Sequence, residues 1–219
     1  MNLSVAVDGP AGAGKSTIAK ILSKNLNLMY INTGAMYRAV TLMAIKNNIM
    51  PEAVEDILKL TESLEMHFEG DNLILNGEDV SERVNMPDIS EKVSSYASIP
   101  LIREKMVKAQ REIAKNYNVI MDGRDIGTVV LKDAPFKFFL TASAEKRAER
   151  RCKELLEKNI KVEYEKVLSD IIERDYADTH REVDPLKKAA SAIEIDCTYL
   201  SIEEVVEKIT CYILNSKNN

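Results

Sequence analysis

The sequence predicts an α/β protein with three layers, in which a central parallel sheet is covered on both faces by helices. Three observations support this fold class. Short apolar runs alternate with longer segments of helical periodicity, as in parallel sheets. A glycine-rich turn joins the first apolar run to the first helical segment. A hairpin signal near residue 70 interrupts the alternation, which predicts a small inserted α+β lobe.

The chain begins with elements that suit the first βα units of such a sheet. Residues 3–7 form a short apolar strand, and a helix over 16–25 follows with apolar residues at helical spacing. A second short strand is predicted over 29–32. Helices are predicted over 35–48 and 51–64. The proline that opens the second of these segments suits a first helical turn.

Residues 63–102 have a different pattern and are expected to form the inserted lobe. Apolar runs at 66–68 and 73–75 are separated by Gly-Asp-Asn, and an Asn-Gly pair follows the second run. The Asn-Gly pair is a strong signal for a tight hairpin turn. A helix over 89–98 completes the lobe.

Beyond the lobe the alternation of strands and helices resumes. Ser143 is placed to cap one helix, and Ser201 forms a capping box with Glu204 at the start of the last one. Residues 175–184 are polar and read as an irregular, mobile lid, whereas residues 215–219 are expected to fray. The remaining elements are a helix over 102–117, strands over 119–121 and 136–141, helices over 143–157 and 164–174, and a strand over 192–196.

The length of 219 residues suits one sizeable core with small inserted lobes rather than two full domains. We expect the core to comprise residues 1–62, 103–147 and 183–219. The inserted lobe then spans residues 63–102, and the helical lid spans residues 148–182.

Charge and cysteine content exclude several classes of function. The formal net charge is −5, the pI is about 5.3 and aromatic residues make up 5% of the chain. Nucleic-acid binding is therefore the weakest hypothesis, because it normally requires a basic excess and stacking surfaces. Three cysteines without a CxxC pattern argue against a disulfide framework or a structural zinc site. We expect a cytoplasmic protein, since neither a signal peptide nor an apolar segment of membrane-spanning length is evident.

The glycine-rich turn matches the phosphate-loop pattern GxxxxGK[ST] and lies between a predicted strand and a predicted helix. Its backbone N–H groups and the helix N-terminus suit phosphate oxygens. Lys15 is placed to bridge β- and γ-phosphates, and Ser16 is placed to ligate Mg²⁺. We therefore expect ATP to bind at Gly9, Pro10, Ala11, Gly12, Ala13, Gly14, Lys15, Ser16 and Thr17.

Two charged turns predict a second, anionic substrate. After the second strand, Thr33 and Arg38 fall at the start of one helix, a position that favours binding of a phosphate or a carboxylate. The alternative, equally open from the sequence, is that Thr33 only caps the helix and Arg38 is only a solvated side chain. After the strand 119–121, the chain reads Asp-Gly-Arg-Asp. Arg124 can hold a phosphate or a base carbonyl, and Asp125 can accept hydrogen bonds from an exocyclic amine. Asp122 resembles in position the acidic residue that supports Mg²⁺ in phosphate-loop proteins.

The last third of the chain is rich in arginine, and several of these residues fall within or beside the expected lid. Arginines that close over a transferred phosphoryl group stabilise its charge. Any single one of them is as well explained by a salt-bridged helix surface, but several in one flexible region indicate a lid. They are Arg147, Arg150, Arg151, Arg174 and Arg181.

Taken in order, the motifs DGPAGAGKST, NTGAMYRA, DGRDIGTVV and PLKKAA resemble the bacterial cytidylate kinase family along nearly the whole chain. The resemblance implies a nucleoside monophosphate kinase fold with a core, a monophosphate-binding lobe and a lid. It also implies a monomer that phosphorylates CMP and dCMP with ATP and Mg²⁺. The lid here, RDYADTHREVDPL, has fewer arginines than we expect of relatives, because Ala177 and Thr179 occupy two of its positions.

The resemblance also assigns roles to individual residues. Lys15, Arg151 and Arg174 take the place of catalytic groups near the transferred phosphoryl, and Ser16 and Asp122 take the place of metal-site residues, the second through water. Residues that resemble CMP ligands are Thr33, Arg38, Ser94, Arg103, Arg124, Asp125, Asp178 and Arg181. Among these, Arg38, Arg103 and Arg124 resemble α-phosphate ligands, while Ser94 and Asp125 resemble the groups that contact cytosine.

Other functions compete with this one. A kinase for AMP, UMP, shikimate or dephospho-coenzyme A would have the same phosphate loop. A carboxylate at Asp125 with the Ser94 hydroxyl favours the amine of cytosine over the carbonyl of uracil. A regulatory switch that binds nucleoside triphosphates belongs to another class, but the sequence has no NKxD-like stretch.

Overall fold

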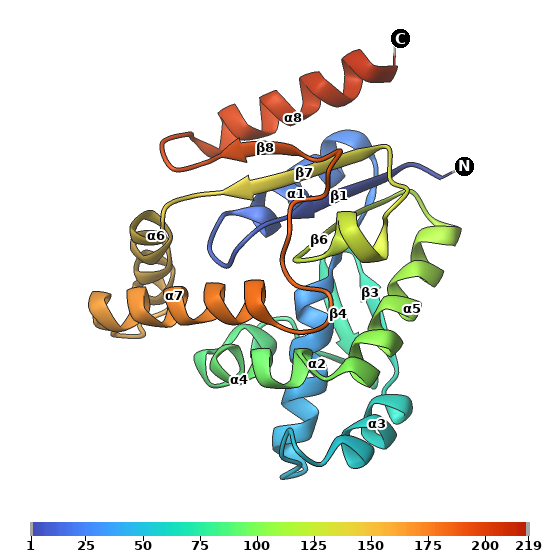
Figure 1. The fold of residues 1–219 in the computed structure, drawn as a ribbon, viewed down its shortest axis with the longest axis vertical. Helices are drawn as coiled ribbons and strands as arrows, with labels where there is room; N and C mark the ends of the chain where they lie inside the picture. The colour runs from blue at the N-terminus through green and yellow to red at the C-terminus, as the bar shows by residue number, and fades with distance from the viewer. Residues whose placement is uncertain (1, 218–219) are drawn as a thin grey trace.

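A computed structural model describes residues 2–217 as an α/β protein with helices on both faces of a central sheet (Figure 1). All strand pairs in this sheet are parallel, and their order is β2-β6-β1-β7-β8, which confirms the predicted fold class. Residues 1, 218 and 219 belong to the predicted core but lie outside the described residues. The strands are β1 (Ser4–Asp8), β2 (Met29–Asn32), β6 (Val119–Gly123), β7 (Phe136–Thr141) and β8 (Ile193–Asp196).

Alternation of side chains along β1 explains the three layers. Val5 and Val7 pack into one apolar cluster with α1 (Lys15–Leu26) and α8 (Ile202–Lys217). Ala6 packs into another cluster on the opposite face, with α2 (Thr33–Lys46) and α5 (Pro100–Asn116). Successive side chains of a strand point to opposite faces, so a strand that is covered on both sides reads as a continuous apolar run.

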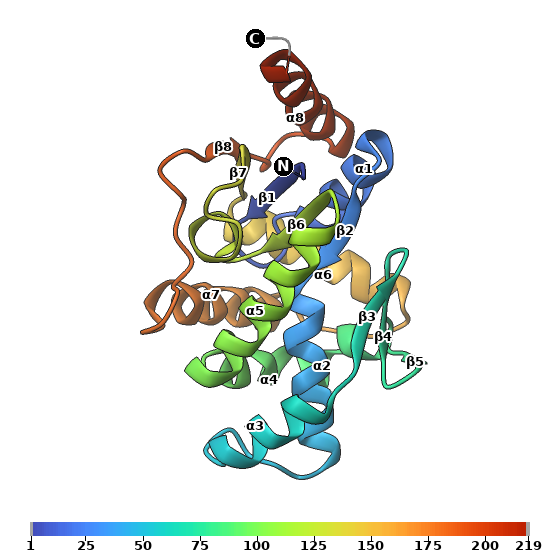
Figure 2. The same ribbon diagram turned by 90° about the vertical axis from the view of Figure 1, so that its right-hand side faces the viewer.

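The inserted lobe contains a separate antiparallel sheet that lies beside α2 (Figure 2). The Asn-Gly turn forms as predicted, because Asn76 and Gly77 have φ angles of 51° and 84°. Leu73 and Leu75 pack with Ala39 of α2, which fixes the register of the hairpin against the core. The lobe follows α3 (Val54–Ser63), and its elements are β3 (Met66–Glu69), β4 (Asn72–Leu75), β5 (Glu78–Asp79), a 3₁₀ turn (Arg83–Asn85) and α4 (Pro87–Ala97).

The structure corrects the predicted end of the lid helix. The polar stretch 175–184 was predicted to be irregular, but α7 (Tyr164–His180) continues six residues beyond 174. Val167, Ile171, Arg174 and Asp178 follow one another at helical spacing and turn inward. The inward face of the helix thus changes from apolar to charged along its length. A prediction based on hydrophobic periodicity alone therefore ended the helix at residue 174.

Several helix ends agree with the capping signals. Ser143 caps α6 (Ala144–Glu157) by accepting a hydrogen bond from the Lys146 N–H, 3.2 Å away. Ser201 and Glu204 form the reciprocal bonds of a capping box before α8. Helix α8 includes residues 215–217, which were expected to fray, whereas 218–219 lie outside the described residues. A π-helical turn over Ile126–Val130, labelled η2, was not predicted.

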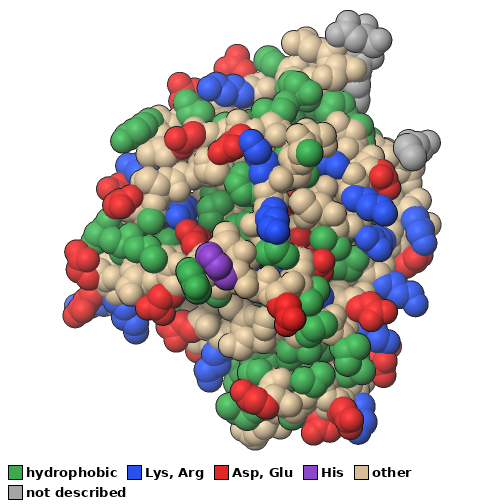
Figure 3. Space-filling view, viewed as in Figure 1, with side chains coloured by type: hydrophobic (Ala, Val, Ile, Leu, Met, Phe, Trp, Pro, Cys, Tyr) green, Lys and Arg blue, Asp and Glu red, His purple; other side chains and the backbone are tan. Residues whose placement is uncertain are grey.

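The surface carries charges of both signs, and the face with α7 is hollowed beside that helix (Figure 3). Cys152, Cys197 and Cys211 all have free thiols. Within residues 2–217, the helices are either too short or too polar to cross a membrane.

Candidate active site

The carboxyl ends of four parallel strands meet at one edge of the sheet and bring the predicted site residues together. The phosphate loop follows β1, Thr33 follows β2, the Asp-Gly-Arg-Asp turn closes β6, and α6 follows β7. The register pairs Asp8 with Gly123 and Asn32 with Asp122, so the three loops begin at the same level. In doubly wound sheets this edge is where ligands bind.

Close packing and left-handed glycines shape the phosphate loop. Gly12 and Gly14 have φ angles of 75° and 88°, in the left-handed region that glycine adopts without strain. A Cβ atom on Gly9 would lie 2.0 Å from the Leu140 carbonyl oxygen of β7, so only glycine fits there. The loop therefore follows a path that its three glycines permit, and it opens into α1 at Lys15.

Lys15 lies in this loop with its charge only partly compensated. The side chain is 5% exposed, and its Nζ donates a hydrogen bond of 2.6 Å to the Pro10 carbonyl oxygen. Burial lowers the pKa of Lys15 well below its usual value, and the nearby Arg124 cation lowers it further. Among residues 2–217, the ammonium forms no ion pair with a carboxylate. An anion in the loop would supply that missing partner.

Ser16, Asp122 and Tyr30 form a chain of short hydrogen bonds beside the loop. The Ser16 hydroxyl donates to Asp122 Oδ2 and the Tyr30 hydroxyl donates to Asp122 Oδ1, both at 2.8 Å. Hydroxyl and carboxylate oxygens are ligands that Mg²⁺ accepts, directly or through water. The predicted pair of metal-site residues therefore lies together, and Tyr30 fixes the carboxylate from the opposite side.

Arg38 and Arg174 come from distant parts of the chain and leave buried N–H groups unused. Within the described residues, the Nε atom of each is buried and has no hydrogen-bond partner. Burial lowers the pKa of Arg38 to about 10 and that of Arg174 to about 9, and repulsion from Arg124 adds to both shifts. Buried, unpaired donors of like charge are costly unless a ligand satisfies them. The cluster is therefore suited to a multiply charged anion.

The lid helix reaches the end of β6 through one ion pair. Arg124 Nε donates to Asp178 Oδ2 at 2.6 Å, and both side chains are mostly buried. Arg151, on α6, instead pairs with the exposed Glu154 at 3.2 Å. Repulsion from Arg151 also contributes to the lowered pKa of Arg38 and of Arg174, so it lies within electrostatic reach of the cluster.

Asp125 is surrounded by two arginines rather than open to solvent. Its Oδ2 accepts a hydrogen bond from Arg103 Nη2, and Arg181 Nη2 lies 3.5 Å from its Oδ1. Burial raises the pKa of Asp125, although both cations oppose the shift. Arg103 is 1% exposed and its guanidinium lies 5.5 Å from the centre of the Tyr37 ring. Arg103 thus lies beside the residue expected to contact the base.

Thr33 and Ser94 differ in how firmly they are held. Asn32, not Thr33, caps α2 by accepting from the Ala35 N–H at 2.9 Å. The Thr33 hydroxyl instead donates to the Asp122 carbonyl oxygen at 2.8 Å and is buried. The interpretation of Thr33 as a cap alone is therefore wrong. Ser94 lies half-buried on α4, which packs against α7.

Two further residues stabilise the site: Asp8, which was not assigned to it from the sequence, and Arg147, which was named only among the possible lid arginines. Asp8 accepts hydrogen bonds from the backbone N–H groups of Ile126 and Gly127, at 2.8 and 2.7 Å, and so anchors the turn after β6. Burial raises the pKa of Asp8 to about 6. Arg147 donates to the Ala11 carbonyl oxygen of the phosphate loop at 3.1 Å. An acidic residue at the end of the strand before the loop was the available signal for Asp8.

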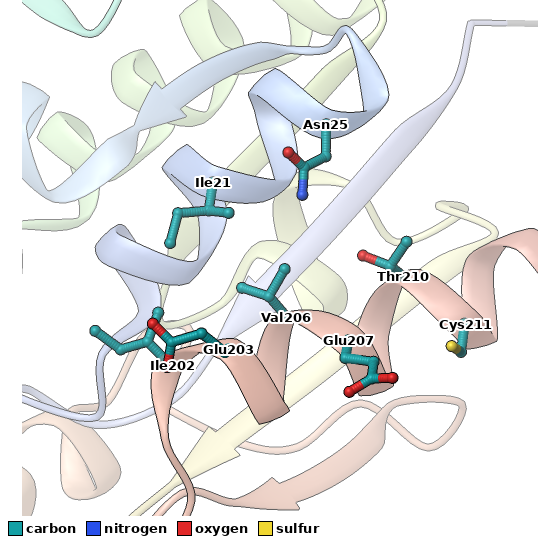
Figure 4. A pocket seen from close by; sticks show the side chains of 8 residues that line it. All are labelled: Ile21, Asn25, Ile202, Glu203, Val206, Glu207, Thr210 and Cys211. Atoms are coloured by element: carbon teal, nitrogen blue, oxygen red, sulfur yellow. The ribbon is translucent and has the colours of Figure 1, made fainter.

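A groove of about 550 Å³ lies away from these residues, between α1 and α8 (Figure 4). Ile21 and Asn25 line it from α1, and Val206 and Thr210 line it from α8. None of the predicted site residues contributes to its walls. The charged cluster at the carboxyl edge of the sheet, and not this groove, is therefore the candidate active site.

Comparisons with known proteins agree with this site. The model of the family described as cytidylate kinase matches residues 5–215. A cytidylate kinase from Clostridium perfringens is 62% identical over 211 residues, which cover 96% of this chain and 97% of that protein. One from Clostridium acetobutylicum is 62% identical over 213 residues, which cover 97% and 98%.

A solved structure supports the fold alone. An uncharacterized protein from Eubacterium ventriosum superposes with a TM-score of 0.54 at 13% sequence identity, covering 98% of this chain and 99% of that one. The family match extends over almost the whole chain and includes the phosphate loop, the turn after β6 and the lid helix. On these grounds the chain belongs to the cytidylate kinase family.

Proposed function

We propose that this protein transfers the γ-phosphoryl group of ATP to CMP and dCMP, forming ADP and the corresponding diphosphate. One observation carries the proposal: Lys15, Arg38, Arg124 and Arg174 gather at the carboxyl edge of the sheet with more positive charge than their carboxylate neighbours balance. Two of the buried N–H groups in this cluster have no partner within residues 2–217. Phosphoryl transfer requires such a cluster, because its transition state spreads negative charge over several oxygens.

The phosphate loop is the proposed donor site. Its backbone N–H groups and the N-terminus of α1 would bind the phosphates of ATP, and Lys15 would reach the β- and γ-phosphates. Arg151 and Arg174 would approach the transferred group from the lid side. Arg147 supports this arrangement by joining the loop to α6 and α7.

The turn after β6 and the lid helix form the proposed acceptor site. Arg38 and Arg124 would hold the α-phosphate of the acceptor, with Thr33 fixing the start of α2. Asp125 and Ser94 would contact the cytosine ring, and Arg103 would assist from beside Asp125. An amine at the ring position facing Asp125 can donate to its carboxylate, whereas the uracil carbonyl would be repelled. Asp178 and Arg181 would contact the sugar and the base from the lid.

Mg²⁺ is the proposed metal, since the oxygens of Ser16 and Asp122 lie 2.8 Å apart beside the phosphate loop and match its preference for hard ligands. Such an ion neutralises charge on the phosphates of ATP when it is bound. Ser16 would bind it directly, and Asp122 would bind it through water. Tyr30 and Ser16 hold the Asp122 carboxylate in the orientation this requires.

The reaction needs no general base from the protein. The acceptor is a phosphate oxygen, which is ionised near neutral pH and is already nucleophilic. Catalysis then depends on holding the two substrates in line and on compensating their charge. The lid arginines would also exclude water, which would otherwise accept the phosphoryl group.

The test is a coupled assay of ADP release with ATP and Mg²⁺ against CMP, dCMP, UMP, AMP, GMP and shikimate. Lys15→Met, purified in parallel, controls for contaminating kinases. We expect turnover largely confined to CMP and dCMP, and abolished by the substitution. Turnover with another acceptor would overturn the assignment of Asp125 to cytosine. ATP hydrolysis that is independent of any acceptor would indicate a nucleotide-driven switch.

A further inference from the structure

Asp184 follows the lid helix in an uncommon backbone conformation. Its φ angle is 49°, in the left-handed region that aspartate and asparagine tolerate better than most other residues. The chain leaves α7 at His180, and the Leu186 N–H donates back to the Asp178 carbonyl oxygen at 2.8 Å. Asp184 therefore lies in a bend between α7 and Leu186 that leads from the lid back to the core.

Two arginines contact Asp184, one at its carboxylate and the other at its carbonyl oxygen. The Asp184 carboxylate accepts a hydrogen bond from Arg103 Nε at 3.0 Å, and its side chain is only 26% exposed. The Asp184 carbonyl oxygen accepts from Arg181 Nε at 2.7 Å and from Arg181 Nη2 as well. In this left-handed conformation the Asp184 side chain faces Arg103, and its carbonyl oxygen faces Arg181.

Both arginines also contact Asp125, one at each carboxylate oxygen. A carboxylate has about four lone-pair positions, so about two remain for a ligand that donates N–H groups. Arg103 has five N–H donors, of which Asp184, Asp125 and the Ala97 carbonyl oxygen take one each. Its remaining donors are therefore held in fixed directions, and Asp184 is the contact that fixes the Nε side.

We propose that Asp184 is a positioning residue for the acceptor site, which holds Arg103 and Arg181 so that Asp125 presents its free oxygen lone pairs to the base. This inference rests on the proposed function, because it takes Asp125 as the residue that contacts cytosine. Asp184 itself touches neither substrate. Its effect is to keep two guanidinium groups and one carboxylate in a single arrangement before the acceptor binds, which reduces the ordering required on binding.

Three substitutions separate the carboxylate from the backbone. Asp184→Gly keeps the left-handed turn and the carbonyl but removes the carboxylate. Asp184→Asn keeps the turn and a neutral acceptor. Asp184→Ala removes the carboxylate and also strains the turn, which displaces the carbonyl from Arg181. Glu182→Gln, on an exposed neighbour, controls for charge, and Asn159→Gly controls for glycine at another left-handed position, where φ is 59°.

The experiment measures equilibrium binding of CMP and of ATP by calorimetry, together with KM, kcat and the CMP to UMP ratio of kcat/KM. We expect Asp184→Gly to weaken CMP binding roughly 10- to 100-fold, which is the loss associated with one hydrogen bond to a charged group. Asp184→Asn should lose less, Asp184→Ala should lose more, and the CMP to UMP ratio should fall in each. ATP binding should change less than two-fold, and both control variants should match the unmodified protein.

A second measurement tests whether Asp184 acts through Arg103. In a double-mutant cycle, Arg103→Lys and Asp184→Gly should lower CMP affinity by less together than the sum of their separate effects. Full additivity would overturn the proposed coupling. Unchanged CMP affinity in both Asp184→Gly and Asp184→Asn would overturn the inference, and so would equal losses of CMP and ATP affinity with a lowered Tm. Failure of the unmodified protein to phosphorylate CMP would instead overturn the proposed function.

Discussion

Arg147 and Asp175 form two hydrogen bonds, 3.1 and 2.6 Å long, that join α6 to α7 beside the phosphate loop. The same guanidinium donates to the carbonyl oxygens of Ala142, after β7, and of Ala11, in the loop. A Cβ atom on Gly12 would lie 3.1 Å from the Arg147 Cβ, so the loop rests directly on this side chain. One arginine thus joins the phosphate loop, the sheet and α7.

Asp175→Asn is expected to weaken this junction. It leaves the Arg147 charge, 4% exposed, without a carboxylate partner, which we expect to lower the unfolding free energy by about 2 kcal/mol because Asp175 itself is partly solvated. kcat/KM for ATP should fall more than CMP affinity, since Arg147 supports the donor loop. Denaturant unfolding and steady-state kinetics check both effects. Glu173→Gln, on the exposed face of α7, should change neither, and a matching loss there would contradict the prediction.

Tyr30→Phe is expected to alter the metal dependence of the reaction. The substitution keeps the buried ring but removes the hydroxyl that donates to Asp122 at 2.8 Å. Loss of such a supporting bond typically weakens metal binding roughly 10-fold or more. The Mg²⁺ concentration for half-maximal activity should rise by about that factor, while kcat at saturating Mg²⁺ changes little. Binding of Mn²⁺ in the presence of ADP, followed by electron paramagnetic resonance, should show the same weakening.

Tyr96→Phe is the matched control for this prediction. Tyr96 is similarly buried, and its hydroxyl donates to the Ile49 carbonyl oxygen at 2.8 Å, which joins α4 to the segment after α2. Removing that hydroxyl should leave the Mg²⁺ dependence unchanged. If the two variants had the same metal dependence, Tyr30 would have only a packing role.

Arg174→Gln is expected to leave the ligand-free protein as stable as before, or to stabilise it. Burial and repulsion from Arg124 and Arg38 both disfavour the Arg174 cation in the absence of an anion. Addition of inorganic pyrophosphate should raise the Tm of the unmodified protein, because binding to the folded state alone stabilises it. The rise should be smaller in the variant. Thermal unfolding over a pyrophosphate titration checks this, and a clear loss of stability in ligand-free Arg174→Gln would argue against the unpaired cluster.

Asp8 is expected to make stability depend on pH between about 4 and 7. Its folded pKa is about 6 against an ordinary value of 3.8, so the folded state takes up a proton first as pH falls. The resulting stabilisation is complete below about 3.8 and is lost as pH rises through 6, by up to about 3 kcal/mol. The stability advantage of the unmodified protein over Asp8→Asn should therefore shrink as pH rises. Urea unfolding at pH 5 and pH 7.5 measures this, and a constant difference would refute the raised pKa.

Much of the fold was predictable because its signals are local. The β1 run is apolar because both faces are covered, and the phosphate loop needs glycine at positions 9, 12 and 14. The carboxyl-edge rule then brought Lys15, Asp122 and Arg124 to the same place. These residues could be grouped from the sequence because the sheet alone determines their position.

The rest was not predictable because it depends on pairs of residues that are far apart in the chain. Arg147 reaches across 28 residues to Asp175, and Arg103 reaches across 81 to Asp184, with no local pattern to connect them. The inward face of α7 becomes charged at Arg174 and Asp178, so the usual apolar periodicity could not show that the helix continues. Ion pairs, rather than apolar packing, hold this end of the lid.

The position of β1 at the centre of the sheet has a consequence for synthesis on the ribosome. This strand is made before its neighbours β6 and β7, which begin only at residues 119 and 136. Pairing over such sequence separations is slow and leaves apolar surface exposed in the meantime. A nascent or truncated chain that ends before β6 would present β1 as an unpaired apolar strand to chaperones and proteases.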